Sequence, residues 1–232
     1  MKNVIYTAAG DQGIVMEFGK EINVETNKII RGMVVKLRRK REVMELIPTF
    51  CSLLVIYDCN RTSFNKMRKL LEKELASLKI TEEESYKVHI IPVCYEEPFN
   101  VDLQHVAEYA GISMSEVVEL HSSREYLIYM LGFLPGFAYL GGLDKRIHCP
   151  RLDSPRVKIP AGSVGIGGEQ TGIYPLDSPG GWQLIGRTPL QPYDPNRNPS
   201  ILYEMGDYIR FKPISVEEYY EILRKEHRIV CI

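Results

Sequence analysis

The residue best suited to bind a ligand lies in a glycine- and proline-rich stretch of the second half of the chain. Arg187 stands between Gly186 and Thr188, where small neighbours let a carboxylate or phosphate approach the guanidinium. A guanidinium can hold such a group with two parallel hydrogen bonds. An arginine that ties together its own loops would show the same pattern, so both interpretations stay open.

A second candidate is the polar pair Gln170 and Thr171, which is flanked by Gly168 and Gly172. The pair can offer an amide and a hydroxyl to a polar ligand, and stabilisation of a turn is the alternative role. The aromatic residues nearby can line an apolar cleft, as aromatic side chains do in ligand pockets. They are Phe133, Phe137, Tyr139 and Trp182. Core packing explains Trp182, the only tryptophan, equally well.

Several other site chemistries are not supported by the sequence. The phosphate-binding pattern GxxxxGK[ST] does not occur, and the glycines of 162–168 lack the GxGxxG spacing of a dinucleotide site. The five histidines lie far apart in sequence and no two cysteines are spaced as CxxC, so no metal site is expected. Ser163 approximates the GxSxG nucleophile motif, but Pro160 before it and Gly167 after it favour a turn serine.

Composition and charge indicate an ordinary globular protein. Twenty-nine basic and 30 acidic residues give a formal charge of −1, which gives no reason to expect nucleic acid or a membrane surface as partner. The uncharged run 126–143 contains three glycines before Gly142 and one proline, so we do not expect a membrane helix. Five unpaired cysteines and no signal peptide predict reduced thiols in the cytoplasm.

Periodicity and composition predict two domains. Apolar spacing predicts strands near 13–18, 52–57 and 86–93 that alternate with helices near 21–41 and 64–78. The predicted N-terminal domain is therefore an α+β sandwich over 1–95, followed by a helical linker over 96–122. Twelve glycines and ten prolines fall between Gly132 and Pro199, which favours a mainly-β domain over 123–232.

The turn-rich stretch is also poor in charge. Between Pro160 and Pro199 there are only five charged residues, although turns are usually polar and exposed. Few charges together with retained aromatic residues are typical of an interface core. Burial inside the domain's own barrel is the competing interpretation.

Three glycine- and proline-rich segments carry a resemblance to a known family. They are 132–142, 155–175 and 178–189. Together they resemble the allophanate hydrolase subunit 1 family, which includes a kinase-A inhibitor of sporulation and the B component of bacterial 5-oxoprolinase. Relatives form part of the carboxyltransferase region of urea carboxylase. The resemblance implies a cyclophilin-like β-barrel in the C-terminal part and a small α+β domain before it.

The resemblance further implies a subunit of an ATP-dependent 5-oxoprolinase, which opens the lactam of 5-oxo-L-proline to L-glutamate. The implied partners are an allophanate hydrolase subunit 2-like and a LamB/YcsF-like subunit. ATP is then bound by the complex, and the isolated chain is expected to be inactive. The expected substrate-binding residues are Arg187, Gln170, Thr171, Phe133, Phe137 and Trp182; no residue is assigned a catalytic role. The alternative is a non-enzymatic inhibitor that binds a sensor histidine kinase.

Overall fold

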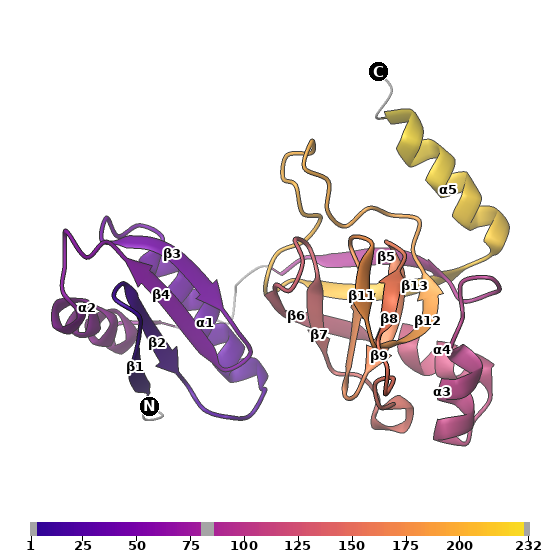
Figure 1. The fold of residues 1–232 in the computed structure, drawn as a ribbon, viewed down its shortest axis with the longest axis horizontal. Helices are drawn as coiled ribbons and strands as arrows, with labels where there is room; N and C mark the ends of the chain where they lie inside the picture. The colour runs from indigo at the N-terminus through magenta and orange to yellow at the C-terminus, as the bar shows by residue number, and fades with distance from the viewer. Residues whose placement is uncertain (1–3, 80–85, 230–232) are drawn as a thin grey trace. The chain divides into compact units, whose positions relative to one another are not determined.

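A computed structural model describes residues 4–79 and 86–229, with side chains up to residue 225. The chain divides into two compact units, 1–85 and 86–232, each with its own packed interior. Both appear in Figure 1, and each is described here by itself.

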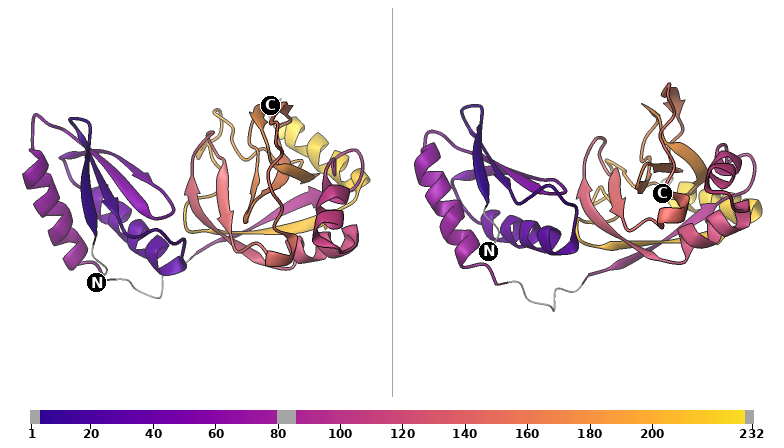
Figure 2. Two further views of the ribbon diagram at one scale, coloured as in Figure 1. Left: turned by 60° about the horizontal axis from the view of Figure 1, so that its bottom comes forward. Right: turned by 90° about the horizontal axis from the view of Figure 1, so that it is seen from below.

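The first unit is a four-stranded antiparallel sheet with two helices. The strands are β1 (Ile5–Ala9), β2 (Gly13–Glu17), β3 (Val43–Pro48) and β4 (Ser52–Tyr57), in the order β1-β2-β4-β3. The helices are α1 (Val24–Leu37) and α2 (Phe64–Ala76), and both lie on one face of the sheet (Figure 2). Alternate residues of β2 and β4, such as Ile14 and Leu53, are fully buried there.

Helix α1 shows why these residues form these elements. The Asn23 side chain caps its first turn, because Asn23 Oδ1 accepts a hydrogen bond from the Thr26 amide at 2.8 Å. Ile30, Met33 and Leu37 repeat at helical spacing and are fully buried. The helix lies within the range predicted from this spacing.

The second unit is built on a closed seven-stranded barrel, which confirms the mainly-β prediction for the C-terminal part. Around the barrel the strands run β10 (Gln170–Ile173), β7 (Ala138–Gly141), β6 (Glu125–Leu131), β13 (Tyr208–Ile214), β5 (Val88–Cys94), β12 (Gln183–Arg187) and β9 (Ser163–Gly167). Strands β8 (Arg156–Ile159) and β11 (Ser178–Gly180) form a separate two-stranded ribbon. All barrel neighbours are antiparallel except β5 and β13.

Helices close the sides of the barrel. They are α3 (Leu103–Ala110), α4 (Met114–Ser122), the short 3₁₀ turn η1 (Lys145–Ile147) and α5 (Val216–Ile229). The predicted capping box at the start of α4 is confirmed, with Ser113 and Glu116 each bonding the other's backbone. Gly111 adopts a left-handed φ of 69° that ends α3 and turns the chain into α4.

The division between the units differs from the predicted boundaries at 95 and 122. Strand β5, expected as the last strand of the first domain, pairs in parallel with β13 along its whole length. Helices α3 and α4, expected as a linker, bury Leu103 and Val117 in the barrel core. The apolar pattern of 86–93 identifies a strand but not its partner, and the partner follows more than 100 residues later. Within the described ranges, no helix has the length and apolar character needed to cross a bilayer.

Candidate functional site

A cleft of about 520 Å³ opens where β12 ends, and Arg187 forms part of its wall. The turn at 161–162, the loop that follows Arg187 and helix α5 supply the other walls. Two of its side chains are guanidiniums, those of Arg187 and Arg197, whereas the only carboxylate among the lining residues is that of Asp194. The cleft therefore favours an anion.

Arg187 fulfils one of its predicted roles and leaves room for the other. Its Nε donates to the Ala161 carbonyl at 2.9 Å, so the side chain does tie two segments together. Among the described residues, no partner is found for its two terminal nitrogens. This half-buried guanidinium can therefore still present two parallel donors to a ligand.

Thr188 adds a further donor to the cleft, and the sequence pattern marked it only as a small neighbour of Arg187. The residue is 2% exposed, and its Oγ1 accepts a hydrogen bond from the Leu190 amide at 3.2 Å. The hydroxyl proton is thus left to donate, because the bond to Leu190 uses the oxygen as an acceptor. A polar residue next to a candidate arginine was the available signal.

The turn at Gly162 fixes this end of β12. Gly162 has φ +81°, and a Cβ there would fall 2.5 Å from the Thr188 carbonyl oxygen, so only glycine fits. Its amide donates to the Tyr174 carbonyl at 2.7 Å, and the Thr188 amide donates to the Gly162 carbonyl at 2.9 Å. The backbone around Arg187 is therefore held from both sides.

Arg197 organises the loop that forms the outer wall. Its guanidinium donates to four backbone carbonyls at 3.1–3.2 Å, those of Gln191, Pro192, Pro199 and Ser200. No carboxylate neutralises it in the described contacts, so its positive charge adds to that of Arg187. The Asp194 carboxylate accepts from the Asn196 amide at 2.8 Å, which makes it part of the same loop.

Helix α5 closes the cleft with Tyr219 and Leu223. Tyr219 is buried and stacks near Phe99, with ring centroids 4.3 Å apart. Burial raises the pKa of the Tyr219 phenol, although the nearby Arg187 charge lowers it in part. The phenol is therefore neutral at physiological pH, and this wall contributes no negative charge.

The structure places Gln170 and Thr171 on β10, and neither lines this cleft. Thr171 is fully buried, where its hydroxyl donates to the Gly165 carbonyl at 3.0 Å and lies 2.8 Å from His121 Nε2. Since that hydroxyl proton is used, Nε2 of His121 donates to Thr171 and Nδ1 accepts from the Tyr95 hydroxyl at 2.8 Å. Burial, aided by the Arg124 charge, lowers the pKa of His121 to about 3, so the ring is neutral.

The aromatic candidates gather in a cluster of their own. Phe137 and Trp182 are buried, 5.5 Å apart between ring centroids, and pack with Tyr174. Phe133 is 62% exposed with a left-handed φ of 65°, and its ring meets that of Phe137 edge-on. None of the candidate aromatic residues lines the Arg187 cleft.

Comparison with known proteins places the chain in a family. The family model described as "Carboxyltransferase domain, subdomain C and D" matches residues 4–203, which span both units. The chain belongs to this family.

Other members of the carboxyltransferase-domain family include three bacterial proteins named as the B component of 5-oxoprolinase. The protein from Bacillus subtilis is 42% identical over 91% of this chain and 93% of its own length. The protein from Haemophilus influenzae is 35% identical over 87% of this chain and 93% of its own length. These relatives confirm the resemblance carried by the three glycine- and proline-rich segments.

Solved structures agree with this family assignment. A conserved uncharacterized protein from Pyrococcus horikoshii is 43% identical, with a TM-score of 0.57 over 93% of this chain and all of its own. The urea amidolyase of Kluyveromyces lactis is 22% identical, with a TM-score of 0.78 over 95% of this chain and 15% of its own. The latter likeness shows a shared fold.

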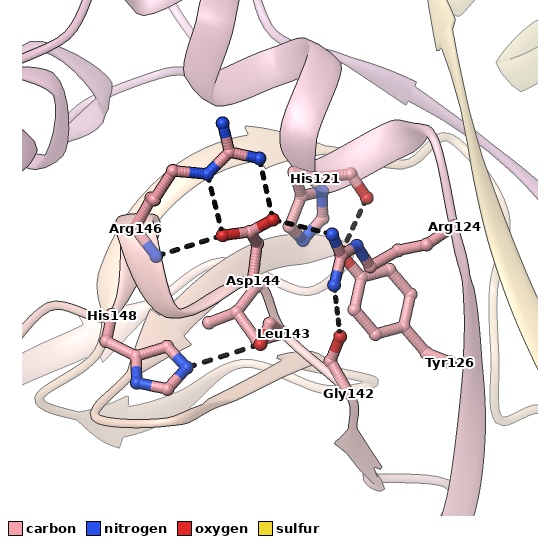
Figure 3. A network of polar contacts seen from close by, with 8 residues as sticks. All are labelled: His121, Arg124, Tyr126, Gly142, Leu143, Asp144, Arg146 and His148. Carbon is pink, nitrogen blue, oxygen red and sulfur yellow. Dashed lines mark hydrogen bonds and ion pairs between the residues drawn. The ribbon is translucent and has the colours of Figure 1, made fainter.

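This member of the carboxyltransferase-domain family has a second polar network, beside α4 and η1, that is closed on itself (Figure 3). Asp144 receives two hydrogen bonds from the Arg146 side chain, at 2.9 and 3.0 Å, and one from Arg124 at 2.7 Å. Hydrogen bonds from Arg146 and the charge of Arg124 hold the pKa of Asp144 well below its usual range. Arg124 also donates to the Gly142 carbonyl at 2.9 Å. A carboxylate so fully engaged serves to fix η1, not to transfer protons.

Metal chemistry has no evident place in the described part of the chain. Across residues 4–79 and 86–229, no three histidine, cysteine, aspartate or glutamate side chains converge as a metal site would require. The Arg187 cleft is therefore the site that we consider for function.

Proposed function

We propose that this chain is the B component of an ATP-dependent, multi-subunit 5-oxoprolinase. The observation that carries the proposal is the 42% identity to the Bacillus subtilis protein of that name over nearly the whole of both chains. The reaction converts 5-oxo-L-proline, ATP and water to L-glutamate, ADP and phosphate. The chain acts in the cytoplasm with an allophanate hydrolase subunit 2-like and a LamB/YcsF-like subunit.

The chemistry needs an anion site, and the Arg187 cleft is suited to provide one. A lactam is a poor electrophile, so we infer that its oxygen attacks the γ-phosphorus of ATP and releases ADP. Water then adds to the activated carbon, phosphate leaves, and the ring nitrogen takes a proton as the ring opens. Throughout, the substrate carboxylate must be held still, because correct positioning lowers the barrier to each step.

In this account Arg187 and Thr188 bind the carboxylate of 5-oxo-L-proline. The two terminal nitrogens of Arg187 donate in parallel, and the Thr188 hydroxyl supplies a third hydrogen bond. Arg197 strengthens the local positive potential while holding the loop in place. The cleft is a part-site, since the sequence has no phosphate-binding loop and the ATP phosphates are left to partner subunits.

Two structural assignments belong to the same proposal. The seven-stranded barrel is cyclophilin-like, and the first unit is an independent α+β domain. A cyclophilin-like barrel does not imply prolyl isomerase activity, because function resides in sites and not in folds.

Reconstitution tests the proposal. The chain and its two partner subunits are co-expressed, purified, and assayed for glutamate formed from 5-oxo-L-proline in the presence of ATP. We expect turnover with all three subunits and none from this chain alone. Full turnover without this chain, or no turnover with all three, would refute the proposed function.

A further inference from the structure

A second concave surface lies on the barrel unit, away from the Arg187 cleft. A hollow of about 540 Å³ is bounded by α3, α4 and the ends of β5 and β13. It adjoins a hollow of about 360 Å³, with which it shares Glu97, Asn100 and Met114. The two form one elongated depression, which we call the acidic groove, and it shares no lining residue with the cleft.

The floor of the acidic groove is apolar. Leu103 of α3, Val118 of α4 and Ile214 of β13 line it, with Pro213 beside them. At its rim Met114 is 45% exposed and Val101 is 62% exposed. Apolar side chains that gather in a concave surface favour a polypeptide partner, and methionine adapts well to a partner's shape.

The charge of the groove has one sign. Glu96 and Glu97 are exposed and line it, whereas no lysine or arginine does. Neither carboxylate forms an ion pair among the described residues. A partner that covers this rim therefore needs a cationic group opposite it, since two uncompensated carboxylates oppose the approach of neutral or acidic surfaces.

The groove is also held rigid from behind. Tyr95 in its wall is buried and hydrogen-bonded to His121, and the capping box of Ser113 and Glu116 fixes the start of α4 next to Met114. A surface that keeps its shape loses little conformational freedom when a partner binds.

We propose that the acidic groove docks a segment of a partner subunit that carries apolar side chains beside a lysine or arginine. This inference rests on the proposed function, because that function supplies the partner subunits. The two concave surfaces of the barrel unit then differ in ligand charge: the cleft takes an anion and the groove takes a basic polypeptide segment.

Two variants test the groove through its two properties. Met114→Glu puts a charge on the apolar rim and suits the first turn of a helix, so the fold is preserved. We expect binding to the partner subunits to weaken about 10-fold or more, the scale of an interface hot spot. The pair Glu96→Gln and Glu97→Gln should weaken binding about 10-fold at about 50 mM salt and flatten its salt dependence.

Matched controls separate these effects from general surface changes. Val157→Glu alters an apolar residue on β8 that is 91% exposed, and Asp153→Asn removes an exposed carboxylate outside the groove. Both should bind as the parent does. Dissociation constants are measured by biolayer interferometry against the purified partner subunits, with circular dichroism to verify that each variant is folded.

The outcomes separate the groove from the function. Groove variants that bind as tightly as the parent, with the same salt dependence, overturn the docking proposal even if the complex hydrolyses 5-oxo-L-proline. Loss of binding in those variants, with parental binding in both controls, supports it. If the complex forms and the groove variants fail to bind, but no glutamate is produced, the docking proposal stands and the proposed function fails.

Discussion

Replacement of Trp182 by alanine distinguishes an interface residue from a core residue. The indole is 4% exposed and packs with Phe137, Tyr174 and Leu184. Its nitrogen lies against Gly167, so closely that a Cβ at position 167 would overlap the ring. The structure therefore assigns Trp182 to the interior of the barrel unit.

The size of the effect follows from this burial. Truncation of a buried aromatic side chain to alanine costs about 3–5 kcal/mol of unfolding free energy, because burial is lost and a cavity remains. For a chain of this size the corresponding fall in Tm is roughly 6–20 °C. An exposed interface residue would instead leave Tm within about 2 °C.

Glycine 167 provides an internal control. Gly167→Ala should destabilise the parent, because the new methyl group overlaps the indole, but should cost much less in the Trp182→Ala background. Urea unfolding followed by circular dichroism gives the four free energies of this cycle. A Trp182→Ala variant with parental stability, or equal costs of Gly167→Ala in both backgrounds, would refute the assignment.

Three further predictions concern the barrel unit. Thr171→Val leaves the imidazole N–H of His121 without its acceptor and should cost about 1–3 kcal/mol in urea unfolding; parental stability would contradict the internal role of Thr171. The pKa of His121 is about 3 when folded and about 6.5 when unfolded, so stability falls as pH drops below about 6.5. Between about pH 7.5 and 5 the parent should lose about 2 kcal/mol more than His121→Gln, and equal losses would contradict this. The fragment 86–232 should fold alone, whereas 123–232, which lacks β5, should not; circular dichroism of both tests the boundary.

Local patterns in the sequence predicted the elements better than their partners. The burial stripe of α1 and the capping box of α4 depend on residues a few positions apart, and both formed as expected. Strand β5 was correctly expected as a strand but placed in the first domain. Its neighbour β13 begins at Tyr208, and no local pattern connects the two.

The candidate site was predicted in part for a similar reason. Arg187 has small neighbours and lies in the cleft, as that pattern indicated. Arg197 organises the wall through backbone carbonyls, a role that depends on the course of the loop and leaves no sequence signature. Thr171 has a glycine on its far side like a turn residue, yet its hydroxyl points to a histidine 50 positions earlier. Sequence alone did not show which face of the strand it occupies.

The most direct test of the proposed site measures substrate affinity at Arg187 in the reconstituted three-subunit enzyme. Arg187→Gln removes the charge and both parallel donors, and Arg187→Lys keeps the charge but cannot form the bidentate contact. With subunit association unchanged, we predict that the KM for 5-oxo-L-proline rises about 10–100-fold in Arg187→Gln and less in Arg187→Lys, since a hydrogen bond to a charged group contributes about 1.5–3 kcal/mol. A parental KM for 5-oxo-L-proline in both variants, or a rise confined to the KM for ATP, would contradict the assignment of the cleft to the substrate carboxylate.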